Sequence, residues 1–318
     1  PDLFGLSKEL GQNGLVLAEG KIWKRHRKLI SMAFHYELLK DITPDVYKIC
    51  DELLERLKTK NLNEISMMDE MKVITGEVIG RVFFGENLSQ YKIQNKPMTT
   101  FLAELIARIG SEAFETLYLL FGKNIVKLRL TERHRKLMDD ITEFRQWCEN
   151  LVRQRMQELQ AEYDQGIRTN KRRKNIVDLF FEQRIQNPAE CLSDDEIVDE
   201  YIAFFSDGMD TTGHFITMMS YYLLKNPEWK EKLFKEIDPI FSDPSNIELE
   251  TLTKLDTLTA CMKETLRLAP PVVTGMERIA LHDHNLAGIQ IKKGTVLMAC
   301  HSANHLDPRF HDDPETYN

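Results

Sequence analysis

The longest uninterrupted helical pattern of the chain lies between Ser193 and Asn226. Its apolar residues recur at helical spacing along two sides rather than one. One stripe is formed by Val198, Ile202, Phe205, Met209, Ile216, Met219 and Leu223, and a second by Tyr201, Phe204, Phe215, Met218 and Tyr222. A helix that is apolar on both sides has to be covered on both sides, so the pattern predicts a buried central helix.

The sequence also contains signals for both ends of this helix. At the start, Ser193 and Glu196 have the spacing of a capping box, in which each side chain accepts a hydrogen bond from the other residue's backbone amide. At the end, Asn226 precedes Pro227, whose ring excludes the helical conformation from the residue before it. About thirty residues span roughly 45–50 Å. We therefore expect this helix to cross the whole domain.

The middle of the helix carries polar residues where apolar ones are expected. Asp207, Asp210, Thr211 and His214 share an arc of about 100° on one face. Gly208 is a poor helix former, but it leaves room for a flat group beside the backbone. Buried ionisable groups are costly and often mark functional sites. The structural alternative is that the threonine bonds back to the preceding turn and that the aspartates face water.

The rest of the chain combines further helical patterns with a short strand-like region. Helical spacing recurs at 44–62, 67–84, 97–121, 131–163, 176–186, 227–240 and 256–268. Dense opposite charges predict that 131–163 is a surface helix. Residues 1–20 are expected to be loop, and the basic segment 164–175 is interpreted as a linker rather than a localisation signal. Alternating β-branched residues at 272–281 and 289–300 predict short strands. The predicted fold class is mainly α, with a small β-sheet near the C-terminal end.

Composition narrows the class of protein. The 318 residues are 42% hydrophobic and 29% charged, which is sufficient for a sizeable core. A net charge of −8 argues against nucleic acid as the main partner. No apolar run reaches the roughly 18 residues that cross a bilayer. The cysteines have no C-x-x-C spacing, and we expect them to be reduced.

Two local clusters are candidates for specific chemistry. Trp23 and Arg27 are four residues apart, so they share one face of a predicted helix that is rich in Lys and Arg. An indole donor beside a guanidinium suits a carboxylate or a phosphate, although a solvated basic helix has the same pattern. Glu264 and Arg267 are three apart and can form a charge-assisted pair, which would contribute under about 1 kcal/mol if exposed.

The order and separation of these motifs carry more information than any one of them. DGMDTT in the central helix is followed by KETLRL, two prolines, Arg278 and AGIQIKKGTVL, and WKRHR lies near the start. From end to end, this arrangement resembles the cytochrome P450 family. DGMDTT is similar to the family's oxygen-activating helix, KETLRL to its E-x-x-R helix, and Trp23 with Arg27 to its W-x-x-x-R motif. The resemblance implies the cytochrome P450 fold and one partial domain over residues 1–318.

The resemblance also implies roles for individual residues. Asp210 and Thr211 would be the acid and alcohol that deliver protons during oxygen activation, which is general-acid work. Gly208 would let haem approach the helix. The haem propionates would be held by Trp23, Arg27 and Arg278.

Two further groups of residues take implied roles. Glu264 and Arg267 would be a buried structural pair, and the substrate pocket would include Phe204, Asp207, Val272, Val273 and Thr274. Asp207 departs from the pattern, because the family usually has alanine or glycine there. Three consequences of that charge stay open: it repels fatty substrates, binds a polar or cationic one, or holds additional water.

The resemblance further implies cofactors, partners and location. These are haem b, O2, electrons from NADPH through NADPH-cytochrome reductase, cytochrome b5 as a further electron donor, and a small lipophilic substrate. The expected place is the cytosolic face of the endoplasmic reticulum membrane, through an amino-terminal anchor. By this comparison about a hundred residues precede the chain, and the haem-ligating cysteine lies beyond Asn318, so we expect no metal ligand within it.

The leading hypothesis is a monooxygenase that inserts one oxygen atom from O2 into an organic, lipophilic substrate. One alternative is a family member that rearranges peroxides as an isomerase or dehydratase, against which Asp210 and Thr211 argue. A haem-free remnant would follow if the whole product lacks the cysteine loop. A metal hydrolase using Asp207, Asp210 and His214 has suitable spacing but no second ligand cluster. No motif encodes the substrate.

Overall fold

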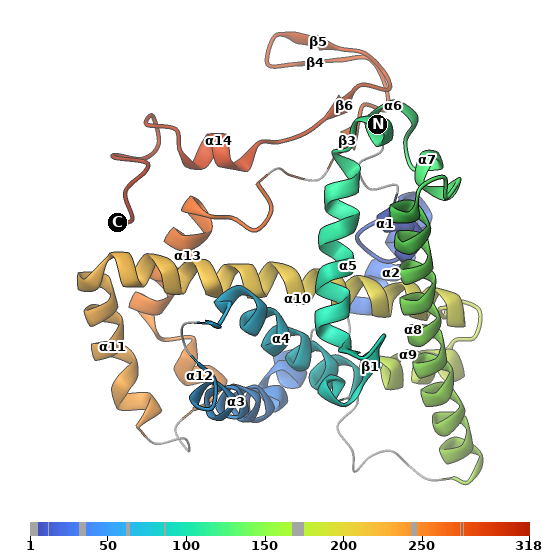
Figure 1. The fold of residues 1–318 in the computed structure, drawn as a ribbon, viewed down its shortest axis with the longest axis horizontal. Coiled ribbons are helices and arrows are strands. Elements are labelled where there is room, and N and C mark those ends of the chain that lie inside the picture. Colours follow the sequence, from blue (N-terminus) through green and yellow to red (C-terminus); the bar gives the residue numbers. More distant parts are fainter. Residues whose placement is uncertain are drawn as a thin grey trace. The chain divides into compact units, whose positions relative to one another are not determined.

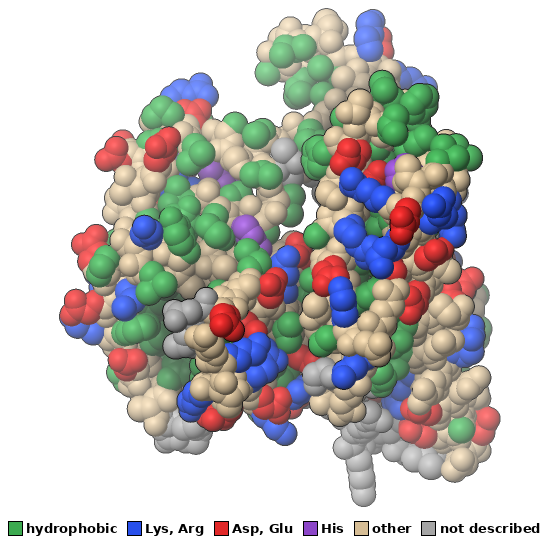
Figure 2. All heavy atoms as spheres, in the orientation of Figure 1, with side chains coloured by type: hydrophobic (Ala, Val, Ile, Leu, Met, Phe, Trp, Pro, Cys, Tyr) green, Lys and Arg blue, Asp and Glu red, His purple; other side chains and the backbone are tan. Residues whose placement is uncertain are grey.

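The structure is a computed structural model and describes residues 6–11, 13–31, 36–61, 64–85, 87–166, 175–242, 247–273, 275 and 277–318. It is mainly helical with short strands, as predicted (Figure 1). The chain divides into two compact units, Pro1–Gly213 and His214–Asn318, and the boundary falls inside helix α10, Asp194–Lys225. On the face shown in Figure 2, acidic and basic side chains are interspersed and form no continuous basic surface.

The first unit is built almost entirely from helices. They are α1 (Ser7–Leu10), α2 (Gly20–Ile30), α3 (Tyr36–Lys58), α4 (Met67–Ile79), α5 (Met98–Ala113), α6 (Thr116–Phe121), α7 (Asn124–Lys127), α8 (Glu132–Asp164), α9 (Ile176–Gln186) and the amino-terminal part of α10. A π-helical turn, Gly80–Phe84, continues α4, and a short antiparallel hairpin of β1 (Lys92–Ile93) and β2 (Lys96–Pro97) precedes α5.

The core of the first unit forms where α5, α8 and α10 meet. The rings of Phe101, Phe144 and Phe205 follow one another, with centroids 6.5 and 6.4 Å apart, and each ring is almost completely buried. Aromatic pairs at this separation attract one another beyond the effect of area burial. The expectation that 131–163 is a surface helix is wrong for one of its faces, because Phe144 and Cys148 on α8 are fully buried. Its dense charges hid the apolar stripe.

Helix α10 begins and ends where the sequence predicts. The Ser193 amide donates to Glu196 Oε2 at 3.0 Å, and the Glu196 amide donates to Ser193 Oγ at 3.3 Å, so the capping box is present. The helix stops before Pro227, which starts α11. The side chain of Asn226 does not cap α11, since its Nδ2 donates back to the Tyr222 carbonyl at 2.8 Å. In the first unit, the predicted stripe of Val198, Ile202, Phe205 and Met209 is buried.

Residues 1–20 were expected to be loop, which is wrong for α1, Ser7–Leu10. Two further local features of the first unit also differ from the sequence prediction. Helix α3 starts at Tyr36 and continues through Pro44, instead of beginning there. A proline inside a helix removes one backbone hydrogen bond and is tolerated when the flanking turns are held by other contacts. The β1–β2 hairpin was not predicted either. Its turn places Gln94 and Asn95 at φ of 51° and 64°. Glycine is the usual sequence signal for this left-handed conformation, and the two turn positions contain none.

The second unit combines helices with two small pairs of strands. It contains the end of α10, α11 (Pro227–Phe241), α12 (Leu249–Leu252), α13 (Asp256–Leu268), β3 (Arg278–Ile279), β4 (His284–Leu286), β5 (Ile289–Ile291), β6 (Val296–Leu297) and α14 (His301–His305). Strand β3 pairs with β6, and β4 pairs with β5 across a turn in which Ala287 and Gly288 have positive φ. Strands β3, β5 and β6 lie in the segments predicted from their alternating pattern, whereas β4 and α14 were not predicted.

Candidate active site

The polar centre of α10 packs closely against α4. Thr75 Oγ1 donates to the Met209 carbonyl at 2.8 Å. A Cβ atom on Gly208 would lie 2.8 Å from Ile79 Cδ1, and one on Gly213 would lie 2.9 Å from the Lys72 backbone nitrogen. Both glycines therefore permit the close approach of the two helices. Gly208 therefore has a packing role against Ile79, and its predicted role in the approach of haem stays a prediction.

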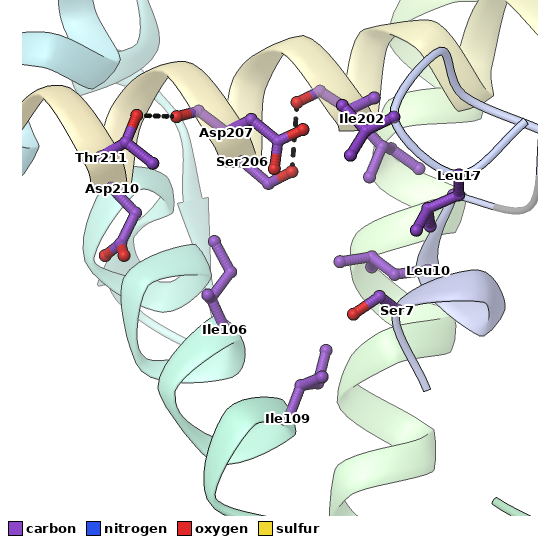
Figure 3. A pocket seen from close by; sticks show the side chains of 13 residues that line it. Ser7, Leu10, Leu17, Ile106, Ile109, Ile202, Ser206, Asp207, Asp210 and Thr211 are labelled. Atoms are coloured by element: carbon purple, nitrogen blue, oxygen red, sulfur yellow. Dashed lines mark hydrogen bonds between the residues drawn. The ribbon is translucent and has the colours of Figure 1, made fainter. Parts of the chain in front are cut away.

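A cavity of about 180 Å³ lies along the same turns of α10 (Figure 3). One wall is the polar face of α10, and the rest is largely apolar and comes from α1, the loop that follows it and α5. The lining residues are Ser7, Leu10, Gly11, Val16, Leu17, Ile106, Ile109, Ile202, Ala203, Ser206, Asp207, Asp210 and Thr211. Two carboxylates and three hydroxyls thus lie in an otherwise apolar wall around a small volume, which is the usual composition of a ligand site.

The predicted acid and alcohol are both on the cavity wall, and both already have partners. Asp210 Oδ1 lies 2.6 Å from Lys72 Nζ on α4. Thr211 Oγ1 donates to the Asp207 carbonyl at 2.5 Å, as the structural alternative anticipated. Because its proton is engaged, the Thr211 oxygen is left to accept a hydrogen bond from a group in the cavity. The sequence did not indicate Lys72, which is more than a hundred residues away.

Asp207 is the second carboxylate of the cavity. Its side chain can be touched by water, yet protein surrounds it on most sides, as expected in a concave wall. Burial raises the pKa of Asp207 to about 6; the Ser206 hydrogen bond opposes this shift, and the negative charges of Asp210 and Glu200 add to it. The group is still mostly ionised at neutral pH.

The loop after α1 is fastened to α10 by its backbone. The Asn13 amide donates to Asp199 Oδ2 at 2.9 Å, and the Leu15 amide donates to Glu200 Oε2 at 3.1 Å. A Cβ on Gly14 would lie 2.8 Å from both the Ala203 Cβ and the Asp199 carbonyl oxygen. Glycine here allows the loop to lie directly on the helix and to form part of the cavity wall. The sequence showed only a glycine-rich loop.

A buried acid–base cluster connects α2 with α10. His26 Nδ1 lies 2.6 Å from Glu200 Oε1, both side chains are fully buried, and the neighbouring Arg25 pairs with Glu196. Burial alone would lower the pKa of His26, but the hydrogen bonds and charges of Glu200 and Glu196 outweigh it and raise that pKa. Burial raises the pKa of Glu200 despite the His26 contact. The sequence showed no signal for this pair.

The same cluster orients the face of α2 that carries Trp23 and Arg27. Both side chains are exposed, Trp23 at 42%. Among the described residues, no carboxylate pairs with Arg27, whereas Arg25 and Lys28 are paired with Glu196 and Glu190. The predicted indole and guanidinium donors are therefore available on the surface of α2, in the arrangement that suits an anionic group.

In the second unit, Glu264 and Arg267 form the predicted pair. Arg267 Nε and Nη2 donate to the two oxygens of Glu264 at 2.8 and 2.7 Å, in bidentate geometry. Arg267 Nη1 also donates to the carbonyls of His305 and Pro314 at 3.0 and 2.6 Å. The side chains are only 12% and 15% exposed. The pair thus attaches α13 to the end of the chain, and its structural role stays a prediction.

The remaining predicted site residues of the second unit are only partly placed. Arg278 lies at the start of β3 and donates to the Glu277 carbonyl at 3.0 Å. Val272 and Val273 are exposed at 52% and 57%, and Thr274 lies outside the described residues. The roles of these residues in holding a cofactor or substrate stay predictions.

Other candidates are separated from the cavity. Phe204 packs against the core of the first unit and does not line the cavity.

In the described part of the chain, no three His, Cys, Asp or Glu side chains gather as a metal site requires, and each cysteine is a free thiol. No helix there has the length and apolar character needed to cross a membrane.

Known proteins of one family are similar to nearly the whole chain. The family model described as Cytochrome P450 matches residues 3–318. Similar proteins include cytochrome P450 4A7 of Oryctolagus cuniculus, 25% identical over 307 residues, and cytochrome P450 4F11 of Homo sapiens, 28% identical over 330 residues. Leukotriene-B4 omega-hydroxylase 3 of Mus musculus is 27% identical over 319 residues.

The alignments cover 96%, 99% and 96% of this chain, respectively. They cover only 59%, 60% and 59% of these relatives, so the chain spans about three fifths of their length. Because the family model matches nearly the whole chain, the protein belongs to the cytochrome P450 family.

Proposed function

We propose that the protein containing this chain is a haem-dependent monooxygenase. It would insert one oxygen atom from O2 into a small lipophilic substrate, with electrons supplied from NADPH by a reductase. The observation that carries this proposal is the position of Asp210 and Thr211, adjacent on one wall of a largely apolar cavity. Family membership and similarity to a protein named as an omega-hydroxylase support the same reaction class.

The residues on α2 fit the cofactor. Trp23 and Arg27 offer exposed donors on one helix face, and Arg27 has no carboxylate partner among the described residues. A guanidinium beside an indole donor matches the carboxylates of haem propionates. Arg278 of the second unit would add a further cation. When bound, haem would supply the iron that activates oxygen.

The chain's own residues would manage protons and water. Lys72 Nζ lies 2.6 Å from Asp210 Oδ1, so it would neutralise and orient this carboxylate. Because both side chains are partly exposed, the pair would connect the cavity with solvent. The Thr211 oxygen can accept a hydrogen bond in the cavity while its proton is held by the Asp207 carbonyl. An acid connected to solvent and a fixed hydroxyl are the requirements for delivering protons at a defined place. The apolar wall of Ile106 and Ile109 would limit water around the substrate.

The proposal includes partners and a location. Electrons would arrive from NADPH-cytochrome reductase, with cytochrome b5 as a further donor. The place would be the cytosolic face of the endoplasmic reticulum membrane. These statements rest on membership of the family.

The test compares Thr211→Ala with Thr211→Ser in the full-length, haem-loaded product. Product formation with O2, NADPH and reductase should fall roughly a hundredfold in Thr211→Ala, the size expected for losing a proton-delivery group. Thr211→Ser keeps a hydroxyl at the same position and should retain most of the activity. Ser220→Ala, an equivalent removal of a back-bonded hydroxyl further along α10, should leave the rate unchanged.

Two results would contradict the proposal. One is undiminished product formation in Thr211→Ala. The other is turnover of peroxides at full rate without O2, NADPH or reductase, which would favour the isomerase or dehydratase alternative. Haem loading should be measured in each variant by its absorption spectrum, so that loss of cofactor is distinguished from loss of proton delivery.

A further inference from the structure

The cavity beside α10 contains an electrostatic asymmetry that the proposed reaction does not use. Its two carboxylates, Asp207 and Asp210, lie about one helical turn apart on the wall formed by α10, with Asp207 beside Ser206 and Asp210 at the other end (Figure 3). Asp210 is neutralised by Lys72 at 2.6 Å. Asp207 has the hydroxyl of Ser206 as its side-chain partner, and no ion pair joins it to a described lysine or arginine. The cavity therefore contains one carboxylate without a counter-ion.

The surroundings of Asp207 favour its neutralisation by a ligand. The negative charges of Asp210 and Glu200 act on it, although Lys72 and His26 each offset one of them, and the surrounding protein atoms further raise its pKa. Across the cavity, the facing side chains are mainly apolar, among them Leu10, Ile106 and Ile109, and the hydroxyl of Ser7 lies beside them. A cation that entered would relieve the repulsion, whereas an anion would increase it.

We propose that this cavity is a subsite for lipophilic primary amines, with Asp207 as the counter-ion of the ammonium group and Ile106 and Ile109 as the contact surface for the hydrocarbon. Asp207 is then the residue that determines specificity for a cationic rather than an anionic ligand. That the amine is a substrate rests on the proposed function. Its binding does not, because every residue involved belongs to the first unit of this chain.

The volume of the cavity sets the size of the ligand. An apolar cavity of about 150 Å³ accommodates benzene. At about 180 Å³, this one suits a hydrocarbon group of similar or slightly larger size, with the ammonium at the polar wall of α10. Hexylamine has a suitable length, and hexan-1-ol and hexanoate provide a neutral and an anionic ligand with the same number of carbon atoms.

The experiment measures binding of these ligands to the chain of residues 1–318 by ligand-observed NMR titration at neutral pH. Hexylamine should bind more tightly than hexan-1-ol, and hexanoate most weakly. Asp207→Asn should weaken hexylamine binding roughly two- to fivefold, the change expected for one partly exposed ion pair, and leave hexan-1-ol binding unchanged. Asp207→Glu keeps the charge and should keep the preference for the amine.

A matched control removes one negative charge elsewhere on the same helix. Asp195→Asn lies on the exposed first turn of α10 and should leave all three affinities unchanged. Circular dichroism of each variant verifies that the helices are intact.

Several results would overturn the proposal. They are the absence of saturable hexylamine binding, tighter binding of hexanoate, an unchanged affinity in Asp207→Asn, or an equal loss in Asp195→Asn. This test requires neither haem nor turnover. If hexylamine does not bind, the monooxygenase proposal is still tested separately by Thr211→Ala. If Thr211→Ala keeps full activity, the proposal of amine binding is unaffected.

Discussion

Both units of the molecule contain acid–base pairs with little exposure to water, and the His26–Glu200 and Glu264–Arg267 pairs differ in how they are built. In the second unit, Glu264 and Arg267 are three residues apart on α13 and meet in bidentate geometry. In the first unit, His26 on α2 meets Glu200 on α10 across a sequence separation of 174 residues. The Glu264–Arg267 pair connects α13 with the last residues of the chain, whereas the His26–Glu200 pair connects α2 with α10.

The two carboxylates respond to their partners in opposite ways. Burial acts to raise the pKa of Glu264, but the hydrogen bonds and charge of Arg267 and the Asn318 amide outweigh it and lower that pKa. Glu200 is fully buried, and there burial outweighs the His26 contact and raises the pKa. The comparison shows that a partner at hydrogen-bond distance stabilises the ionised acid only when desolvation is smaller than the attraction.

The largest effect is expected from Arg267→Ala. It leaves Glu264 without its partner and removes the donors to the His305 and Pro314 carbonyls, so the second unit should lose about 3–5 kcal/mol of unfolding free energy. Hydrogen exchange of the α13 amides measures this loss.

Lys292→Ala provides the control in the same unit. It removes an exposed pair with Asp283, in which the side chains are 80% and 57% exposed, and should leave the unfolding free energy nearly unchanged. A similar loss of unfolding free energy in both variants would show that burial does not make the Glu264–Arg267 pair more stabilising than an exposed pair.

A smaller effect is expected from His26→Leu. Glu200 then loses its partner but keeps the Leu15 amide and can take up a proton, so the expected loss is about 2–3 kcal/mol. Exchange of the α2 amides reports it. In the double variant with Glu200→Leu, no buried acid is left unpaired, so the combined loss should be smaller than the sum of the single losses. Simple additivity would argue against a direct interaction.

The smallest effect is a difference in pH dependence between the two units. The pKa values of His26 and Glu200 are both raised, so the folded first unit holds protons more tightly than the unfolded chain. The contribution of His26 to stability is complete below the unfolded histidine value of about 6.5 and is lost as pH rises through its folded value. The contribution of Glu200 is complete only below the unfolded glutamate value of about 4.3 and is likewise lost as pH rises through its folded value. The charged groups facing His26 are Glu200 and Glu196, with Arg25 beside it.

The second unit should respond with the opposite sign. The pKa of Glu264 is lowered, so its contribution is present above the unfolded glutamate value of about 4.3 and is lost as pH falls through the folded one. The charged groups that act on it are Arg267 and His311. After correction for intrinsic rates, exchange protection of α2 should fall as pH rises above about 6.5, and that of α13 should fall below about 4.3. Parallel pH profiles, or an unchanged α2 profile in His26→Leu, would contradict this assignment.

The sequence by itself determined the features that depend on local spacing. The bounds of α10 follow from its capping box and from Pro227, because both signals act within one helical turn. The Glu264–Arg267 contact follows from a spacing of three residues on a helix. The grouping of Asp207, Asp210 and Thr211 on one face follows from the helical period, and the order of the motifs was sufficient to identify the family.

Only the tertiary structure decided which distant residues complete the site. Lys72 pairs with Asp210, the loop at Gly14 lies against α10, and Ile106 on α5 closes the cavity. These contacts join segments more than eighty residues apart, and no local pattern encodes which helix faces which. The buried face of α8 was missed for a related reason, since surface charges dominate its sequence while a few apolar positions decide its packing. Local periodicity specifies an element and its faces, whereas the partner of each face depends on the packing of the whole unit.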